Sequence, residues 1–155
     1  MLQAIFVLLQ GPANEEVMLE ELARMKEPGM RELTDSTFEH QTQAATGATT
    51  GDWLVMFFTP GCELCQRLTA ALETVGCQQR GRANVASVNK ETYGEKTGRR
   101  FELGLGDQPD IILFRQGKMY RYNIDKFDPD SLMSFMNGFY KNLPAENIPL
   151  PKTPL

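Results

Sequence analysis

The chain has 155 residues, of which 41% are hydrophobic and 23% are charged, and its formal net charge is −4. This composition is typical of a folded domain with a real core and excludes disorder over most of the chain. The acidic balance argues against a nucleic-acid partner, and the basic clusters Arg80–Arg82 and Gly98–Arg100 are interpreted as solvated charge on loops. Three cysteines are too few for a disulfide scaffold.

The N-terminal part divides into an apolar run and a helical stretch. Residues 1–13 contain the apolar segment Leu2–Leu9, for which two interpretations stay open: a short secretory signal, or an arm packed on the domain. No Lys or Arg precedes this segment, and it is too short to span a membrane. Residues 14–29 predict a helical extension, which Asn14 would cap and Pro28-Gly29 would end.

Strands and helices alternate through the middle of the chain. A short strand is expected over 30–34, then a helix through Phe38 capped by Asp35 or Ser36, and a loop from Gln41 to Thr50. A buried strand over 53–61 and a helix over 66–75 follow, then a strand over 84–89 and a helix over 91–102.

The last third predicts a turn over 104–109, a hairpin, a helix and a tail. The hairpin strands 110–115 and 118–123 flank Gln116-Gly117, and the helix begins at Asp128-Pro129. Residues 142–155 contain prolines at 144, 149, 151 and 154, which favours an extended, proline-rich tail. Strands that alternate with helices and end in a hairpin and a helix predict an α/β fold with a mixed central sheet.

The sequence Cys62-Glu63-Leu64-Cys65 lies at the junction between a predicted strand and a predicted helix. A Cys-x-x-Cys pair in this position is typical of a thioredoxin-like redox site. The unpaired amides and the dipole at the start of a helix stabilise a thiolate on the first cysteine. The second cysteine lies about one turn later, close enough to form a disulfide with the first.

With these elements in this order, the chain resembles a thioredoxin-superfamily domain, in the style of protein disulfide isomerase catalytic domains and their membrane-anchored relatives. The resemblance runs from about Arg31 to Lys141, within a domain assigned to residues 30–141. It rests on the segment 32–38, the cysteine motif with its strand, the segment 108–117 and the final helix. It implies the thioredoxin fold, with a mixed central β-sheet flanked by helices, and no cofactor.

The resemblance also implies roles for single residues. Cys62 would be the nucleophile toward a partner disulfide, and Cys65 would be the resolving cysteine that releases the partner. Gly61, Gln108 and Pro109 would bind an extended protein substrate, and the bond before Pro109 is expected to be cis, as in the family. The substrates would be proteins with disulfides or thiols.

Several positions depart from the family pattern. Gly61 stands where isomerases have tryptophan, and Glu63-Leu64 stands where they favour Gly-His. A glutamate opposes a neighbouring thiolate by like-charge repulsion, so we expect Cys62 to have a higher pKa and the pair to be a weaker oxidant. Met56 occupies the position of a buried acid that helps to move a proton, which predicts slow turnover.

Three further residues have two interpretations each. Arg115 could approach Cys65 and lower its pKa, or it could be a solvated residue at a hairpin end. Cys77 is expected to be a small, partly buried residue, with an intermolecular or regulatory thiol as the alternative; at 12 residues from Cys65 it is ~18 Å away along a helix. His40 is expected at the surface or in a cap, and no metal site is expected.

The sequence therefore supports a thiol–disulfide oxidoreductase, weakly oxidising or slow. The alternatives are a redox-weak binding or chaperone-like module and an interaction domain that docks a partner through its proline-rich tail or its N-terminal helix. The endoplasmic reticulum lumen or secretory pathway is the expected location, with the cytoplasm as the alternative.

Overall fold

The computed structural model of the chain describes residue 19 and residues 29–47, 51–104 and 106–151. The predicted signal or arm lies outside these residues, and so does nearly all of the predicted helical extension. In the part of the chain that is described, no helix has the length and apolar character needed to cross a membrane.

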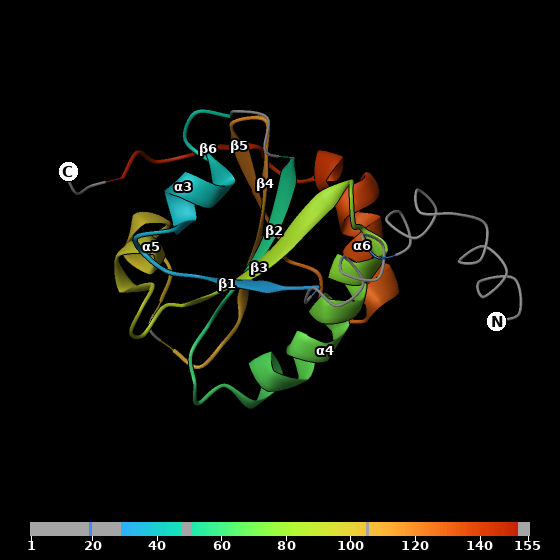
Figure 1. The fold of residues 1–155 in the computed structure, drawn as a ribbon, viewed down its shortest axis with the longest axis horizontal. Helices are drawn as coiled ribbons and strands as arrows, with labels where there is room; N and C mark the ends of the chain where they lie inside the picture. Colours follow the sequence, from blue (N-terminus) through green and yellow to red (C-terminus); the bar gives the residue numbers. More distant parts are fainter. Residues whose placement is uncertain (1–18, 20–28, 48–50, 105, 152–155) are drawn as a thin grey trace, which may run out of the picture.

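A six-stranded sheet in the order β1-β3-β2-β4-β5-β6 forms the centre of the fold (Figure 1). Its strands are β1 Arg31–Leu33, β2 Asp52–Phe58, β3 Ala83–Asn89, β4 Asp110–Arg115, β5 Lys118–Arg121 and β6 Glu146–Asn147. β1 and β2 both run parallel to β3. β4 runs antiparallel to β2, β5 antiparallel to β4, and β6 antiparallel to β5. The mixed sheet that the sequence predicts is therefore confirmed.

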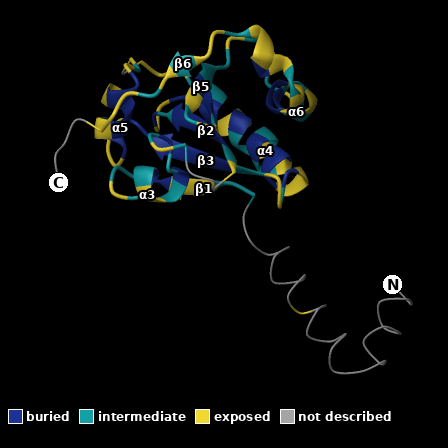
Figure 2. Ribbon diagram, turned by 90° about the horizontal axis from the view of Figure 1, so that it is seen from above, coloured by how far each residue is buried: buried dark blue, intermediate teal, exposed yellow. Residues whose placement is uncertain are grey.

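Helices cover both faces of this sheet. On one face lie α4, Glu63–Gln78, and α6, Pro129–Asn137, which continues into the short 3₁₀ helix η1, Phe139–Asn142; on the other lie α3, Phe38–Thr42, and α5, Glu95–Arg100 (Figure 1). Because both faces are covered, β2 is buried along nearly its whole length, which explains its continuous apolar sequence (Figure 2).

Two hydrophobic cores lie on opposite faces of the sheet. The core under α4 and α6 contains Leu68, Leu72, Val75, Leu132, Phe135 and Met136, with both motif cysteines at its edge. The core under α3 and α5 is built on Phe38, Phe57, Phe101 and Phe114, whose rings contact one another. Edge-to-face contacts of this kind add to the free energy gained by burial alone.

Some elements differ from the sequence predictions for identifiable reasons. The helix after the motif starts at Glu63 and runs to Gln78, because Cys62 caps it and Gly76 allows it to pass close to Gly29. Asp35 does not cap the helix that follows it; its carboxylate accepts hydrogen bonds from the Lys96 and Thr97 amides in α5 instead.

The proline-rich segment is partly incorporated into the sheet. Glu146 and Asn147 form β6, which pairs with β5, and Arg121 of β5 forms an ion pair with Glu146 over 2.9 Å. Farther along, the Pro149 carbonyl accepts a hydrogen bond from the buried Arg100 side chain at 2.7 Å. These contacts attach the first part of the proline-rich segment to the domain, which the sequence did not predict.

Candidate redox site

The two motif cysteines form a disulfide at the N-terminus of α4. Their Cα atoms are 5.2 Å apart, and Cys62 is the N-cap residue, whose sulfur accepts a hydrogen bond from the Cys65 amide at 3.0 Å. The next turn of the helix is held by Thr69, whose hydroxyl donates to the Cys65 carbonyl. The sulfur of Cys62 therefore lies where the helix amides would stabilise a thiolate in the reduced protein.

Both cysteines are buried in the disulfide form. Cys62 is 1% exposed and Cys65 is 2% exposed, whereas Gly61 and Glu63 on either side of Cys62 are exposed. Burial of the nucleophile was not expected from the sequence. A partner protein can reach the Cys62 sulfur only after the residues around it have moved.

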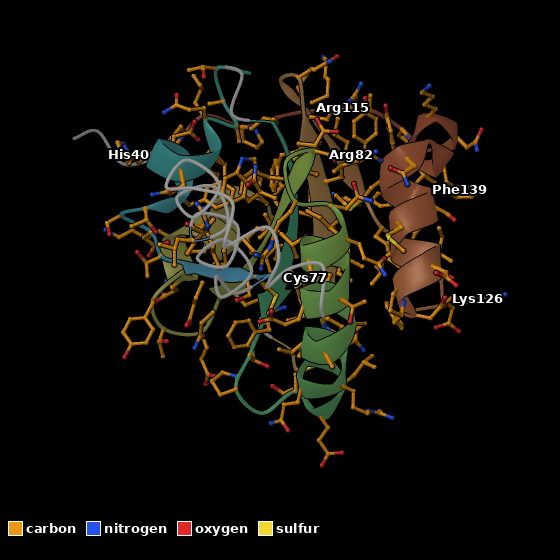
Figure 3. The ribbon with its side chains drawn as sticks, turned by 45° about the vertical axis from the view of Figure 1, so that its right-hand side comes forward. His40, Cys77, Arg82, Arg115, Lys126 and Phe139 are labelled. Carbon is orange, nitrogen blue, oxygen red and sulfur yellow. A yellow bond between two sulfur atoms is a disulfide. The ribbon has the colours of Figure 1, made fainter. Side chains whose placement is uncertain are left out.

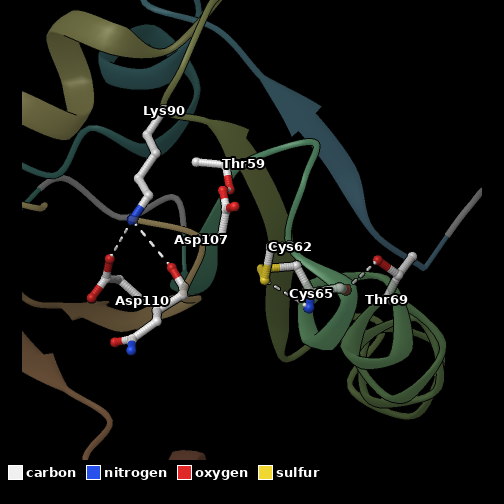
Figure 4. The surroundings of a disulfide bond; sticks show 8 residues. Thr59, Cys62, Cys65, Thr69, Lys90, Asp107 and Asp110 are labelled. Atoms are coloured by element: carbon white, nitrogen blue, oxygen red, sulfur yellow. Dashed lines mark hydrogen bonds and ion pairs between the residues drawn. A yellow bond between two sulfur atoms is a disulfide. The ribbon is translucent and has the colours of Figure 1, made fainter. Parts of the chain in front are cut away.

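A hydrogen bond joins the loop before the motif to the loop before β4. Thr59 follows β2, and its hydroxyl donates to the Asp107 carboxylate at 2.6 Å (Figure 4). The same carboxylate faces Gly61, because a Cβ at that position would lie 3.2 Å from an Asp107 oxygen. Two acidic side chains, Asp107 and Glu63, therefore flank the residues around Cys62, which strengthens the expectation of a less acidic thiol.

The buried Lys90 side chain binds the loop that contains Gln108 and Pro109. This side chain is 2% exposed, and its ammonium group donates to the Gln108 carbonyl at 3.1 Å and to the Asp110 carboxylate at 2.9 Å (Figure 4). A buried ammonium group requires such partners, because an unpaired charge in the interior is strongly destabilising. Gln108 itself is exposed and Pro109 is half-buried.

The expectation of a cis bond before Pro109 was wrong, since no described residue has a cis peptide bond. The trans isomer is the intrinsically favoured one. Lys90 binds the Gln108 carbonyl before Pro109 and the Asp110 carboxylate after it, which holds the loop on the domain.

Arg115 is not part of the site. Its guanidinium donates to the Asp52 carboxylate at 2.7 Å and lies 5.4 Å from the centre of the Tyr140 ring, at the end of the sheet away from the cysteines (Figure 3). Asp52 begins β2 and the motif follows its other end, so the separation is about 20 Å. The hydrogen bond to Asp52 raises the Arg115 pKa, and the guanidinium does not approach Cys65.

A hollow of about 410 Å³ lies next to Cys65. Its lining residues come from β1 and the residue before it, from β2 and the loop after it, from β3 and from the first turns of α4. They include Met30, Glu32, Met56, Thr59, Ser87 and Thr69. Met56 is buried in the wall, so β2 offers no proton acceptor at this position, as the sequence predicts. The only carboxylate that lines the hollow among the described residues belongs to Glu32.

Of the remaining candidates, Leu64 lies within the motif, whereas Cys77 and His40 lie away from it. Leu64 packs on the core beneath the motif. Cys77, in the last turn of α4, is an exposed free thiol rather than the partly buried residue that we expect from the sequence (Figure 3). His40 is exposed in α3. In the described part of the chain, no group of three or more His, Cys, Asp or Glu residues is arranged to hold a metal ion.

Sequence reasoning missed Lys90, Asp107 and Glu32. The clearest available signal was the segment Asp107-Gln-Pro-Asp110, in which two carboxylates flank the expected substrate-binding loop. Lys90 carried a weaker signal, as a charged residue directly after a buried strand.

Comparisons with known proteins agree with this fold. Residues 29–138 match the family model described as Thioredoxin. A thioredoxin domain-containing protein of Theileria parva is 37% identical over 119 residues, which cover 77% of this chain and 53% of that protein. The chloroplastic 5'-adenylylsulfate reductase 3 of Arabidopsis thaliana is 29% identical over 87 residues, or 55% of this chain and 19% of that protein.

Solved structures of ERdj5 are also similar. Full-length ERdj5 matches with a TM-score of 0.65 at 25% identity, over 83% of this chain and 19% of that chain. The J-Trx1 fragment of ERdj5 matches with a TM-score of 0.59 at 23% identity, over 73% of this chain and 52% of that fragment. The chain spans about half the length, or less, of the curated relatives above.

Proposed function

The chain belongs to the thioredoxin family, and on that premise we propose that its Cys62–Cys65 pair is a thiol–disulfide oxidoreductase site acting on protein disulfides or thiols. The observation that carries the proposal is the disulfide itself, at the N-terminus of α4 with Cys62 as the helix cap. In the reduced form, the helix N-terminus favours the Cys62 thiolate, which attacks a partner disulfide.

The cycle has two exchange steps. The Cys62 thiolate forms a mixed disulfide with one partner sulfur, and the other partner sulfur leaves as a thiolate. Cys65 then attacks the Cys62 sulfur, which restores the Cys62–Cys65 disulfide and releases the second partner sulfur. The partner is reduced by two electrons and the pair is oxidised by two, so an external reductant must reduce the pair before the next turnover.

The environment of Cys62 supports a weakly oxidising, slow variant of this chemistry. Asp107 and Glu63 bring negative charge near the thiolate, which stabilises the disulfide relative to the dithiol and makes the pair more reducing. Cys62 is also 1% exposed, so an encounter with a protein partner requires local opening. Gln108 is exposed and Pro109 is half-buried, and the preceding residue Asp107 faces Gly61, which supports a role for this loop in contacting an extended substrate.

Reduction of insulin by the reduced protein, with dithiothreitol as the electron source, tests the proposal. We expect activity above the dithiothreitol background for the native chain and for Cys77→Ser, and none above background for Cys62→Ser. Cys77 is the matched control because it is the free thiol on the same helix. Equal rates for Cys62→Ser and the native chain would remove the enzymatic proposal.

The second candidate is a thioredoxin-fold binding module whose redox chemistry is vestigial. The burial of both cysteines favours it, because a site kept closed reacts poorly with large partners. Binding of a reduced, unfolded protein that is unaffected by Cys62→Ser, together with absent insulin reduction, would support this candidate over the first.

We propose the endoplasmic reticulum lumen or secretory pathway as the location. The similarity to thioredoxin domains of ERdj5 and the stability of disulfides in oxidising compartments support it. Microscopy of the tagged protein beside compartment markers tests this proposal, and a diffuse cytoplasmic signal would favour the alternative location.

A further inference from the structure

The second exchange step requires a proton acceptor for Cys65. The resolving cysteine attacks as a thiolate, so its thiol must lose a proton. Cys65 is 2% exposed, which limits direct transfer to bulk water, and Met56 on the neighbouring strand cannot accept a proton. An acceptor must therefore be reached through the hollow that Cys65 lines.

Glu32 lines this hollow and is the first of three residues paired on adjacent strands. Glu32 in β1 pairs with Ser87 in β3, and Ser87 pairs with Met56 in β2. Residues paired in this way lie on the same face of the sheet, and strands are about 4.8 Å apart, so the Glu32 backbone is about 10 Å from that of Met56. Glu32, Ser87, Met56 and Cys65 all line the same hollow.

The hollow connects these groups through space that water can fill. Its volume is about 410 Å³, whereas one water occupies about 30 Å³ in the liquid. The hydroxyls of Ser87, Thr59 and Thr69 belong to lining residues and provide polar partners for such water. Water held by these hydroxyls would connect Cys65 with Glu32, whose side chain is exposed at the rim of the hollow.

We propose that Glu32 is the proton acceptor of the resolving step, an inference that rests on the proposed oxidoreductase function. The Cys65 thiol gives its proton through water in the hollow to the Glu32 carboxylate. The Cys65 sulfur then forms a bond to the Cys62 sulfur, while the bond between Cys62 and the partner breaks. Its electron pair leaves on the partner sulfur, which takes up a proton, and Glu32 returns its own proton to solvent.

The other charged groups around the hollow do not take this role. Asp107 accepts the hydrogen bond of Thr59 on the side toward Gly61, and Lys90 is engaged with Asp110. Glu63 and Arg67 belong to the exposed side of α4, and Arg31 precedes Glu32 on β1. None of these five side chains is among the lining residues.

Stopped-flow reaction of the reduced protein with 5,5'-dithiobis(2-nitrobenzoate) separates the two steps. The first release of thionitrobenzoate reports attack by Cys62, and the second reports resolution by Cys65. In a Cys77→Ser background, Glu32→Gln should leave the rate of the first phase unchanged and slow the second phase by roughly tenfold or more at pH 6–7. General bases typically accelerate a step by about 100-fold or more, and we expect a smaller effect here because the proton is transferred through water. The two proteins should converge at high pH, where hydroxide removes the proton.

Glu32→Asp and Glu91→Gln are the matched variants. Glu32→Asp keeps the carboxylate and should recover part of the second phase, whereas Glu91→Gln removes an exposed acid after β3 and should change neither phase. An unchanged second phase in Glu32→Gln, or equal slowing of both phases, would overturn the proposal.

A second measurement does not depend on turnover. In Cys62→Ser/Cys77→Ser protein, Cys65 is the remaining thiol, and its pKa follows from the pH dependence of iodoacetamide alkylation. Because ionised Glu32 opposes a thiolate across the hollow, Glu32→Gln should lower the Cys65 pKa, while Glu91→Gln should not. No difference would overturn the inference about Glu32, whereas a missing first phase in the stopped-flow experiment would instead argue against Cys62 as a nucleophile.

Discussion

The ammonium group of Lys90 offers the sharpest test of how this site is held together. In Lys90→Met the side chain keeps its length but loses its hydrogen bonds to the Gln108 carbonyl and the Asp110 carboxylate. Removal of one partner from a buried ion pair costs about 3 to 5 kcal/mol. The Asp110 side chain is 38% exposed and can be rehydrated, so we expect a smaller loss, about 2 to 3 kcal/mol.

Thermal and urea unfolding measure this loss. A cost of about 2 to 3 kcal/mol corresponds to a Tm lower by roughly 8 to 12 °C for a domain of this size. Lys96→Met, at an exposed position of α5, is the control and should change stability by less than about 0.5 kcal/mol. Asp110→Asn should cost less in the Lys90→Met background than alone, because the two side chains share one interaction. A Lys90→Met protein as stable as Lys96→Met would refute the reasoning.

Three more predictions concern single residues. Asp107→Asn removes a negative charge beside Gly61, so the Cys62 pKa of the reduced protein should fall; an unchanged pH profile of alkylation would contradict this. Gly76→Ala normally stabilises a helix by about 1 kcal/mol, but here its Cβ would lie 1.8 Å from the Gly29 carbonyl oxygen, so urea unfolding should show a loss. Burial, with a smaller contribution from a nearby carboxylate, raises the pKa of Tyr122 from 10.0 to about 12. The resulting stabilisation is fully present below pH 10 and is lost as pH rises toward 12, and Tyr122→Phe should flatten that dependence in unfolding experiments between pH 9 and 12.

The local elements of the fold were predictable because they depend on local patterns. The buried strand before the motif, the Gln116-Gly117 hairpin and the Asp128 cap of α6 all follow from residues adjacent in sequence, and the structure contains each of them. The family resemblance added the order in which they assemble. The position of Cys62 at the start of α4 followed from the same reasoning.

Contacts between distant segments were not predictable in this way. Arg115 pairs with Asp52, which lies 63 residues earlier, so its position in the hairpin gave no sign of its partner. Glu32 reaches the hollow only because β1 lies beside β3 in the sheet. The β6 strand depends on pairing with β5, since a two-residue strand has no pattern of its own.

Trapping of a mixed disulfide tests the central claim most directly. In Cys65→Ser/Cys77→Ser protein, Cys62 can attack a disulfide-containing protein, but no second cysteine remains to release the product. After reaction with native insulin, we expect a covalent adduct on non-reducing gels and in intact-mass spectra that dithiothreitol removes. The triple variant with Cys62→Ser should form none. If the Cys65→Ser/Cys77→Ser protein forms no adduct while it remains folded, Cys62 is not a nucleophile toward protein disulfides, and the account is wrong.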